Sequence, residues 1–570
     1  MRFFTRLRVT DQRSPRYVGD RPKKFAYQWM RLAHVCCRWR GITLDIPWLW
    51  AEIQLDKQWP IDFLHAQFDH AKDNTLSIQV ALRDRFTPLF TVTCTTKLDK
   101  LRALDITRDS DPKDVQEALH TLSGSAENLE VFSVEGVHVD IPATLFAGGA
   151  PKLRHFALVN CESIPWDATL FRNGAITHLH LELGDPFSTP PIERISWAQL
   201  YSLLTAVKDT LESFKLLQSL QEEPLPEDLL SKEPVMLPQL KHITLNGFAF
   251  EISLALEHII RFPPSTHSII GATLDQDAYL EFEKLMSAIA SARSSTLEIK
   301  DMTIEATRNR LTQLQQVDRN RSSLTKIVAY ASAKPIPSDN GEIQVDLRTP
   351  IFELTLHCPR NAEVWEEHFY PFSQSELVPG VSLSHLEHLR LAPILGAAAN
   401  IPDSFWEMIS QLETLKSLEI SEMGIGGFLK MLKEDSSVLA NAIYHRLEAT
   451  ETDDAHHSAG EQVPHTNRAL SPDQRRFGLL HRLSLELIPD LNQKTRRQLS
   501  DGFKILQRNL AERQALGLGV EDLRVTSCCL AEWKKEALEL LGAVVKVEPL
   551  RPWTAEGMNL MIDHIEPIAL

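Results

Sequence analysis

The chain has 570 residues, of which 43% are hydrophobic and 24% charged, a composition typical of globular rather than disordered proteins. This length exceeds what one hydrophobic core supports, so it predicts several domains or one elongated repeat array. The net charge is −16, divided into +9 for residues 1–40 and −25 for the remaining 530. An acidic body argues against nucleic acid as the main ligand. Because no apolar run could span a bilayer and no signal peptide is recognisable, we expect a cytoplasmic or nuclear protein that binds no membrane.

The first 60 residues divide into a basic tail and a tryptophan-rich segment. Residues 1–25 are basic and poor in aliphatic side chains, which predicts a disordered tail. Residues 26–60 contain four of the eleven tryptophans, namely Trp29, Trp39, Trp48 and Trp50. Four positions in this segment have spacings that predict one shared helix face: Leu32, Val35, Cys36 and Trp39. We expect a small helical element that either packs on the rest of the chain or is presented to a partner.

From residue 101 onward a short phrase recurs: apolar, two residues, apolar, one residue, apolar. Its clear copies begin at Leu101, Leu129, Leu153, Ile176, Leu211, Leu240, Ile351, Leu386, Leu415, Leu480 and Val520. Weaker copies lie at 294–299 and 324–327. The early copies follow each other after 28, 24, 23, 35 and 29 residues. This spacing resembles that of leucine-rich repeats, in which each unit of about 20–29 residues supplies a strand and a helix.

Segments of helical period lie between the phrases. Residues 197–207, 279–289 and 405–415 carry apolar side chains at intervals of three and four. Asp403 and Ser404 stand where the N-cap of the third helix is expected. Together these patterns predict an α/β leucine-rich-repeat solenoid, with a strand plus a helix per repeat, preceded by a small helical segment. An ordinary α/β domain with leucine-rich strands is the alternative.

The repeat array is predicted to be interrupted once. We expect repeats over residues 61–432, followed by a polar, partly disordered insertion over residues 433–476. Residues 477–570 are expected to form the C-terminal repeats and a cap, because the phrases at Leu480 and Val520 lie there.

The residues beside the middle apolar position of each phrase are expected to point away from the core, onto the concave face of a solenoid. Six of them form a candidate target-binding surface: His155, His178, His180, His242, His388 and Arg390. Polar filler on a strand surface is the plainer interpretation of this row. The sharper hypothesis is a recognition surface whose affinity changes between about pH 5.5 and 7.5, as imidazoles titrate.

Sequence motifs for catalysis or cofactor binding were not found. The chain lacks a phosphate-binding glycine loop, a nucleophile elbow, a zinc-protease motif and any Cys/His set with zinc spacing. Its seven cysteines include no C-x-x-C pair and are expected to be reduced thiols. We therefore expect a protein that is not an enzyme and that needs no cofactor or metal.

The tryptophan-rich segment resembles a known family. "HVCCRWRGITLDIPWLWAEIQLD" resembles the second half of the F-box of fungal, especially basidiomycete, F-box and leucine-rich-repeat proteins. In that pattern an H-V-C-R-x-W-R helix is followed by a P-x-L-W segment. The motif covers about 25 residues, and the repeats extend the resemblance along most of the chain. The family's first Leu-Pro-x-Glu helix is not recognisable in residues 1–28, which leaves two alternatives: a sequence lost upstream, or an incomplete F-box.

The resemblance implies a non-catalytic substrate-recognition subunit of an SCF ubiquitin ligase. In such a subunit the F-box binds the Skp adaptor, and through it the cullin, while the repeats bind a target protein. The adaptor contacts that the resemblance implies are Val35, Cys36, Trp39, Pro47, Leu49 and Trp50. The alternative is a leucine-rich-repeat interaction scaffold that does not bind the adaptor, in which the head caps the exposed end of the repeat core.

Overall fold

The computed structural model describes part of the chain. The described residues are 30–55, 60–82, 87–107, 110–166, 170, 175–183, 194–221, 224–274, 278–293, 297–298, 301–308, 323–330, 336–337, 343–344, 352–358, 381–382, 385–391, 403–421, 428, 431, 480, 482–487, 506, 508–512, 520, 522–527 and 546–548. They fall into two compact units: unit 1 holds Met1–Gly247 with His258–Pro263, and unit 2 holds Phe248–Glu257 with Pro264–Leu570. The predicted disordered segments, 1–25 and 433–476, lie outside the described residues.

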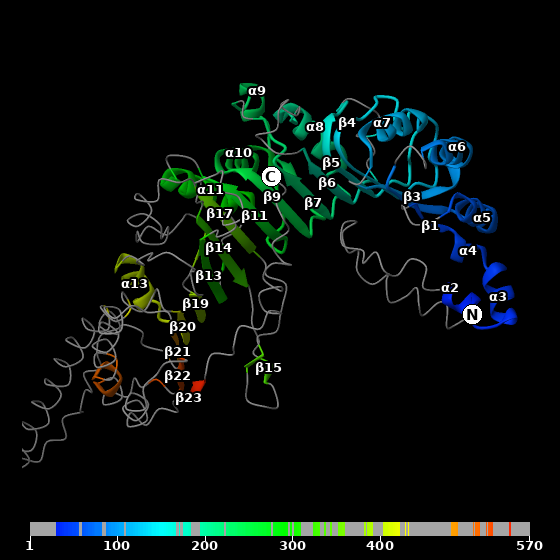
Figure 1. Ribbon diagram of the computed structural model, residues 1–570. Helices are drawn as coiled ribbons and strands as arrows, with labels where there is room; N and C mark the ends of the chain where they lie inside the picture. Colours follow the sequence, from blue (N-terminus) through cyan, green and yellow to red (C-terminus); the bar gives the residue numbers. More distant parts are fainter. Residues whose placement is uncertain are drawn as a thin grey trace, which may run out of the picture. The chain divides into compact units, whose positions relative to one another are not determined.

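Unit 1 contains a parallel sheet whose strands follow one another in chain order (Figure 1). Its strands are β1 (Glu52–Leu55), β2 (Leu76–Val80), β3 (Leu101–Ile106), β4 (Val131–Asp140), β5 (His155–Ser163), β6 (His178–Glu182), β7 (Ser213–Leu217) and β9 (His242–Phe248). A separate parallel pair joins β8 (Val235–Met236) to β10 (Ile260–Arg261). Parallel neighbours need crossover connections, and much of the chain between these strands is helical.

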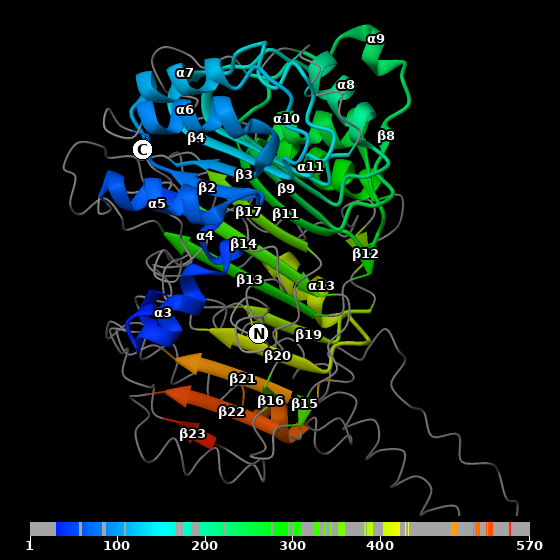
Figure 2. The same cartoon turned by 90° about the vertical axis from the view of Figure 1, so that its right-hand side faces the viewer.

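Helices cover one side of this sheet (Figures 1 and 2). They are α5 (Ile61–Ala71), α6 (Thr87–Lys97), η1 (Leu98–Lys100), α7 (Pro112–Thr121), α8 (Trp197–Val207) and α9 (Glu227–Leu230). Capping fixes where two of them begin. Asp111 accepts a hydrogen bond from the amide of Lys113 at 2.9 Å, and Ser196 and Gln199 form a reciprocal capping box.

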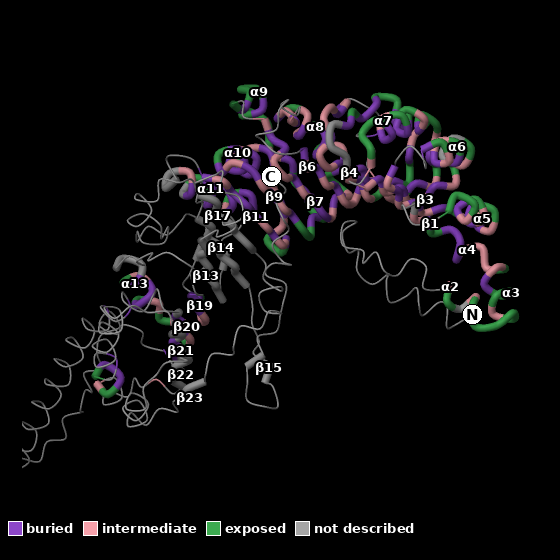
Figure 3. The backbone as a smooth tube through the Cα atoms, in the orientation of Figure 1, coloured by how far each residue is buried: buried purple, intermediate pink, exposed green. Residues whose placement is uncertain are grey.

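The core of unit 1 lies between the strands and these helices. In β3, Leu101, Leu104 and Ile106 are fully buried, and the residues between them are half-buried. Figure 3 shows the same recurrence of buried residues along the neighbouring strands. The repeated phrase therefore places its apolar positions toward the helices, and the intervening residues form the opposite surface, which we call the strand face.

Side chains also join successive repeats at the beginnings of the strands. The hydroxyl of Thr210 donates to the carbonyl of Ile176 at 2.8 Å, and the Lys241 ammonium lies 2.7 Å from a carboxylate oxygen of Glu212. Unit 2 repeats both contacts, because Thr414 donates to the carbonyl of Leu386 at 2.9 Å and Lys416 pairs with Glu387 at 2.9 Å. The same local arrangement thus recurs in both units.

Unit 2 begins with α10 (Ala249–Leu254), which leads into a π-helical turn over Ala255–Ile259. Its other described helices are α11 (Ala278–Ala292) and α13 (Asp403–Ser410). Its sheet has the order β11 (His267–Thr273), β17 (Phe352–Cys358), β14 (Ser323–Tyr330), β13 (Asp301–Arg308), β19 (His388–Leu391), β20 (Ser417–Ser421), β21 (Arg482–Leu487), β22 (Asp522–Ser527) and β23 (Lys546–Glu548). All strand pairs of this sheet are parallel except those of β14, which is antiparallel to both neighbours.

Two short strand pairs lie outside this sheet. They are β12 (Leu297–Glu298) with β18 (Val381–Ser382), and β15 (Ile336–Pro337) with β16 (Ile343–Gln344).

A buried arginine closes the C-terminal end of α11. Arg293 is 1% exposed, and its guanidinium donates to the carbonyls of Pro264 and Thr266 and to the hydroxyl of Ser268. Burial lowers the pKa of Arg293 to about 10, so the side chain remains a cation near neutral pH. It ties the helix to the turn that precedes β11.

The prediction of an α/β fold is confirmed, and each of the eleven clear phrases overlaps a strand. The helix predicted over 197–207 is α8, and the one over 279–289 lies within α11. The third helix ends at Ser410 rather than at 415, because Leu415 already belongs to the core at the start of the next strand. Asp403 opens that helix, so the predicted N-cap position was wrong. Of the weaker copies, one is β12, outside the main sheet, and the other is the antiparallel β14.

Candidate functional site

Two surfaces were singled out by the sequence: the N-terminal head and the strand face. The head, residues 30–51, consists of α2 (Met30–Ala33), α3 (Cys37–Leu44) and α4 (Pro47–Trp50). Pro47 at the first position of α4 suits a helix start, because its missing N–H would have no partner there.

Trp50 anchors the head to the first helix of the repeats. Its indole is 6% exposed and lies against α5, with ring centroids 4.6 Å from His70 and 6.4 Å from Phe63. The indole Nε1 donates a hydrogen bond to the carbonyl of Thr43 at 2.9 Å, which ties α4 back to the end of α3. Leu49 is buried beside it. Both side chains pack within the chain and leave little exposed apolar surface, and their contact with an adaptor stays a prediction.

The expected single helix over residues 32–39 is corrected. The chain leaves the helix after Ala33, and Cys36 is fully extended, with φ −163° and ψ 169°. Val35 is β-branched and Val and Cys are both poor helix formers, which disfavours a continuous helix at this point. Val35 is 63% exposed and Cys36 is exposed, while Trp39 and Pro47 are half-buried. Of the six residues that the resemblance implies, Val35 and Cys36 are therefore the most accessible.

Four of the predicted histidines lie on the strand face of unit 1. The register places His155, His178, Ser213 and His242 in one row across β5, β6, β7 and β9. His180 lies in the adjoining row, between Ala157 and Lys215. The remaining two residues belong to unit 2, where His388 lies opposite Ser417 and the Arg390 guanidinium lies 3.2 Å from Glu419. The prediction thus corresponds to two local surfaces, one in each unit.

His155 and His178 form a stacked pair. Their ring centroids are 4.0 Å apart with an interplanar angle of 23°, and Nδ1 of His178 lies 2.9 Å from the hydroxyl of Thr177. Burial, together with the neighbouring His155, lowers the pKa of His178 to about 4, and burial likewise lowers the pKa of His155. The pair is therefore neutral near pH 7. For His178, the expected titration between about pH 5.5 and 7.5 was wrong, because contact with its neighbour and loss of water both disfavour the charged ring.

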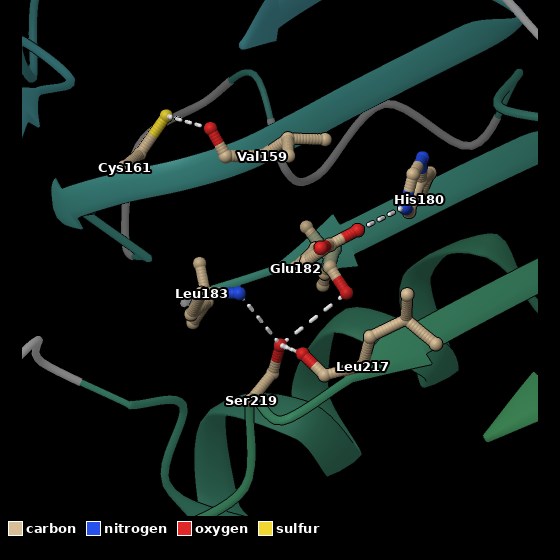
Figure 4. A network of polar contacts seen from close by, with 8 residues as sticks. Val159, Cys161, His180, Glu182, Leu183, Leu217 and Ser219 are labelled. Carbon is tan, nitrogen blue, oxygen red and sulfur yellow. Dashed lines mark hydrogen bonds and ion pairs between the residues drawn. The ribbon is translucent and has the colours of Figure 1, made fainter. Parts of the chain in front are cut away.

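The opposite ends of β6 and β7 are held by a polar network (Figure 4). The buried Ser219 hydroxyl accepts the amide of Leu183 at 3.1 Å and lies 2.6 Å from the carbonyl of Leu217 and 3.3 Å from that of Leu181. Beside it, Nε2 of His180 lies 3.4 Å from a carboxylate oxygen of Glu182. Glu182 could have been found from the sequence, because it follows His180 by two residues on the same strand face. Ser219 lies beyond the strand and carried no such signal.

A buried cysteine completes this region. The Sγ of Cys161 lies 3.8 Å from the carbonyl of Val159, and burial raises the pKa of its thiol to about 12. Such a thiol is inert toward electrophiles, since the thiolate is the reactive form.

Charged side chains border the histidine row at the strand beginnings. The ion pair with Lys241 lowers the pKa of Glu212, which keeps that carboxylate charged. Glu130 and Arg154 also act on His155, with opposite effects on its pKa. The strand face therefore combines the neutral pair of His155 and His178 with charges of both signs.

Two searches of the described residues, one for metal-holding groups and one for membrane-crossing helices, found none. Within those ranges, no group of three or more His, Cys, Asp or Glu side chains could hold a metal ion. No described helix combines the length and apolar character that a membrane crossing requires.

No protein-family model matches the sequence. A search of curated proteins found no match either.

Proposed function

We propose that this protein is a non-catalytic target-recognition subunit of an SCF-type ubiquitin ligase, acting in the cytosol or nucleus. The head binds the Skp adaptor, and through it the cullin, while the strand face of a leucine-rich-repeat solenoid binds a target protein. Ubiquitin transfer belongs to other subunits of the ligase, so no residue of this chain acts on a substrate chemically.

The observation that carries the proposal is the division of roles within the head. Its C-terminal part, with Leu49 and Trp50, is buried against the repeats. Its N-terminal part leaves Val35 63% exposed in the turn between α2 and α3, and Ile42 39% exposed on α3. Exposed apolar side chains contribute to binding when a partner buries them, and in the head they lie next to a part that is fixed against the repeats. The F-box resemblance covers these same residues, which is why we assign the adaptor to this surface.

The strand face supports the second half of the proposal. Parallel strands in chain order present successive rows of side chains, so that a target can contact several repeats at once. The stacked pair of His155 and His178 is neutral near pH 7 and lies near charged residues of both signs, which favours hydrogen bonding over purely electrostatic capture.

A second candidate is a repeat scaffold that does not bind the adaptor. The burial of Trp50 and Leu49 favours it, because Trp50 packs on α5 and the C-terminal part of the head can then serve as a cap of the first repeat. In that case the exposed part of the head has another role.

Binding of the full chain to a recombinant fungal Skp adaptor distinguishes the two. Val35→Asp places a charge on the exposed loop, and we expect it to weaken binding by about tenfold or more, as at an interface hot spot. Val92→Asp is the matched control, since Val92 is 62% exposed on α6, outside the head. It should leave the affinity unchanged. Absence of binding by the wild-type chain, or equal effects of both substitutions, would contradict the proposal and favour the scaffold.

A further inference from the structure

Two adjacent thiols are exposed in the head. Cys36 and Cys37 are both free and exposed, whereas Cys161 is free and buried. They occupy the junction between α2 and α3, directly after Val35. Solvent-accessible cysteines with a second thiol close by are the ones that oxidants convert reversibly, because the neighbour resolves the first oxidation product.

Two hydrogen bonds of Arg40 lie at this junction. The carbonyl of Cys36 accepts the amide of Arg40 at 3.0 Å, which closes the first turn of α3. The Arg40 side chain reaches back, and its Nε donates to the carbonyl of Ala33 at 3.2 Å. The orientation of α3 relative to α2, and with it the position of Val35, depends on this short stretch of backbone.

We propose that Cys36 and Cys37 form a peroxide-responsive dithiol that oxidises to a disulfide between adjacent residues. One thiol, as its thiolate, attacks hydrogen peroxide; the O–O bond breaks, and a sulfenic acid and one water form. The second thiol then attacks that sulfur, an S–S bond forms, and the sulfenic oxygen leaves as a second water. Two electrons pass from the two sulfurs to the peroxide, and a dithiol reductant reverses the reaction by thiol–disulfide exchange.

Oxidation changes the junction because the geometry of the reduced state does not suit a disulfide. Adjacent Cα atoms lie about 3.8 Å apart across a trans peptide, whereas disulfides span about 4.4–6.8 Å. That Cα–Cα distance is fixed by the peptide bond, so the eight-membered ring closes only with strained dihedral and peptide angles at Cys36 and Cys37. We expect this strain to disturb the first turn of α3, which the bond from the Arg40 amide to the Cys36 carbonyl closes. A disulfide closed in this way is easily reduced, as expected for a regulatory rather than a structural bond.

Mass spectrometry of the intact folded chain tests the dithiol directly. After treatment with hydrogen peroxide and alkylation, the tryptic peptide of residues 32–38 should lose the mass of two hydrogen atoms and regain it with dithiothreitol. Cys36→Ser and Cys37→Ser should each abolish this loss, and the remaining thiol should instead be trapped as a sulfenic acid by dimedone. Cys161 should remain unmodified. Two thiols that stay reduced, or that appear only as cross-links between chains or as sulfonic acids, would overturn the proposal.

A second experiment asks whether the disulfide regulates adaptor binding, and it rests on the proposed function. If the head binds the adaptor, oxidised wild-type chain should bind at least about tenfold more weakly than reduced chain, and dithiothreitol should restore binding. If the reduced chain does not bind, the adaptor proposal fails while the mass measurement still decides the dithiol. If oxidised and reduced chains bind equally, the disulfide does not control the head, and the regulation of adaptor binding is refuted.

Discussion

The packing of Trp50 predicts that one substitution releases the head from the repeats. Trp50→Ala removes an indole that is 6% exposed, contacts His70 and Phe63 of α5 and bonds the carbonyl of Thr43. All of these contacts lie within unit 1. The substitution should therefore weaken the docking of α3 and α4 and leave unit 2 unaffected.

The magnitude follows from the contacts that are lost. Replacing a buried tryptophan by alanine costs about 3–5 kcal/mol through lost burial and the cavity that remains. At about 1.4 kcal/mol per decade, opening of the head should rise by about a hundredfold to several thousandfold. Trp50→Phe keeps one aromatic ring but loses the N–H and part of the indole, so it should cost more than the about 1 kcal/mol of a single hydrogen bond and less than Trp50→Ala.

Hydrogen exchange in the full chain measures this opening locally, without requiring two-state unfolding of both units. Amides of α3 and α4 should exchange much faster in Trp50→Ala, at an intermediate rate in Trp50→Phe, and normally in Val35→Asp. If Trp50→Ala left the exchange of α3 and α4 unchanged, the indole would not be the anchor, and the account of the head would be refuted.

Three further predictions concern the repeats. His178 has a pKa of about 4 against an ordinary 6.5, so the unfolded chain binds a proton that the folded protein does not, and stability should fall as the pH drops through this window. His178→Gln should reduce this loss of stability. Amide exchange of β6 at about pH 7 and about pH 4.5 measures the loss in both proteins. An identical loss in the variant and the wild type would contradict the stacked neutral pair. Ser219→Ala leaves the amide of Leu183 without its hydrogen-bond acceptor and should lower local stability by about 1–3 kcal/mol. Faster amide exchange at the ends of β6 and β7 would show this, and unchanged exchange there would refute the role of the network. Arg293→Ala should destabilise α11 and β11 by about 2–5 kcal/mol, because it leaves a cavity and unpaired carbonyls, and chemical denaturation with exchange detection would show unit 2 opening first. Equal stability of this variant and the wild type would argue against the buried contacts of the arginine.

The strands of this fold could be predicted because their signal is local and repeated. Each phrase combines a buried face of period two with a spacing that brings the next phrase beside it, so Leu101, Leu104 and Ile106 identified a core strand directly. The same reasoning missed β13, and it could not show that β14 runs antiparallel between β13 and β17. Strand direction depends on connections far apart in the sequence, which apolar spacing alone does not encode.

The candidate surfaces were predictable in position but not in chemistry. The alternation of apolar and polar residues along β5 and β6 sufficed to place His155 and His178 on the strand face. It could not show that their rings stack and lose contact with water, which lowers the pKa of His178. In the head, regular spacing predicted one helix through Val35 and Cys36, whereas the chain turns there. The motif also could not predict which tryptophan is buried, because the burial of Trp50 depends on α5, which lies outside the motif.

The central claim is that the exposed part of the head, rather than the strand face, binds the adaptor. Hydrogen exchange of the full chain with and without a recombinant fungal Skp adaptor tests this most directly. We predict slower exchange over α2 and α3, with no change over β5, β6, β7 and β9. Unchanged exchange throughout the chain, or protection of the strand face instead of the head, would contradict the account.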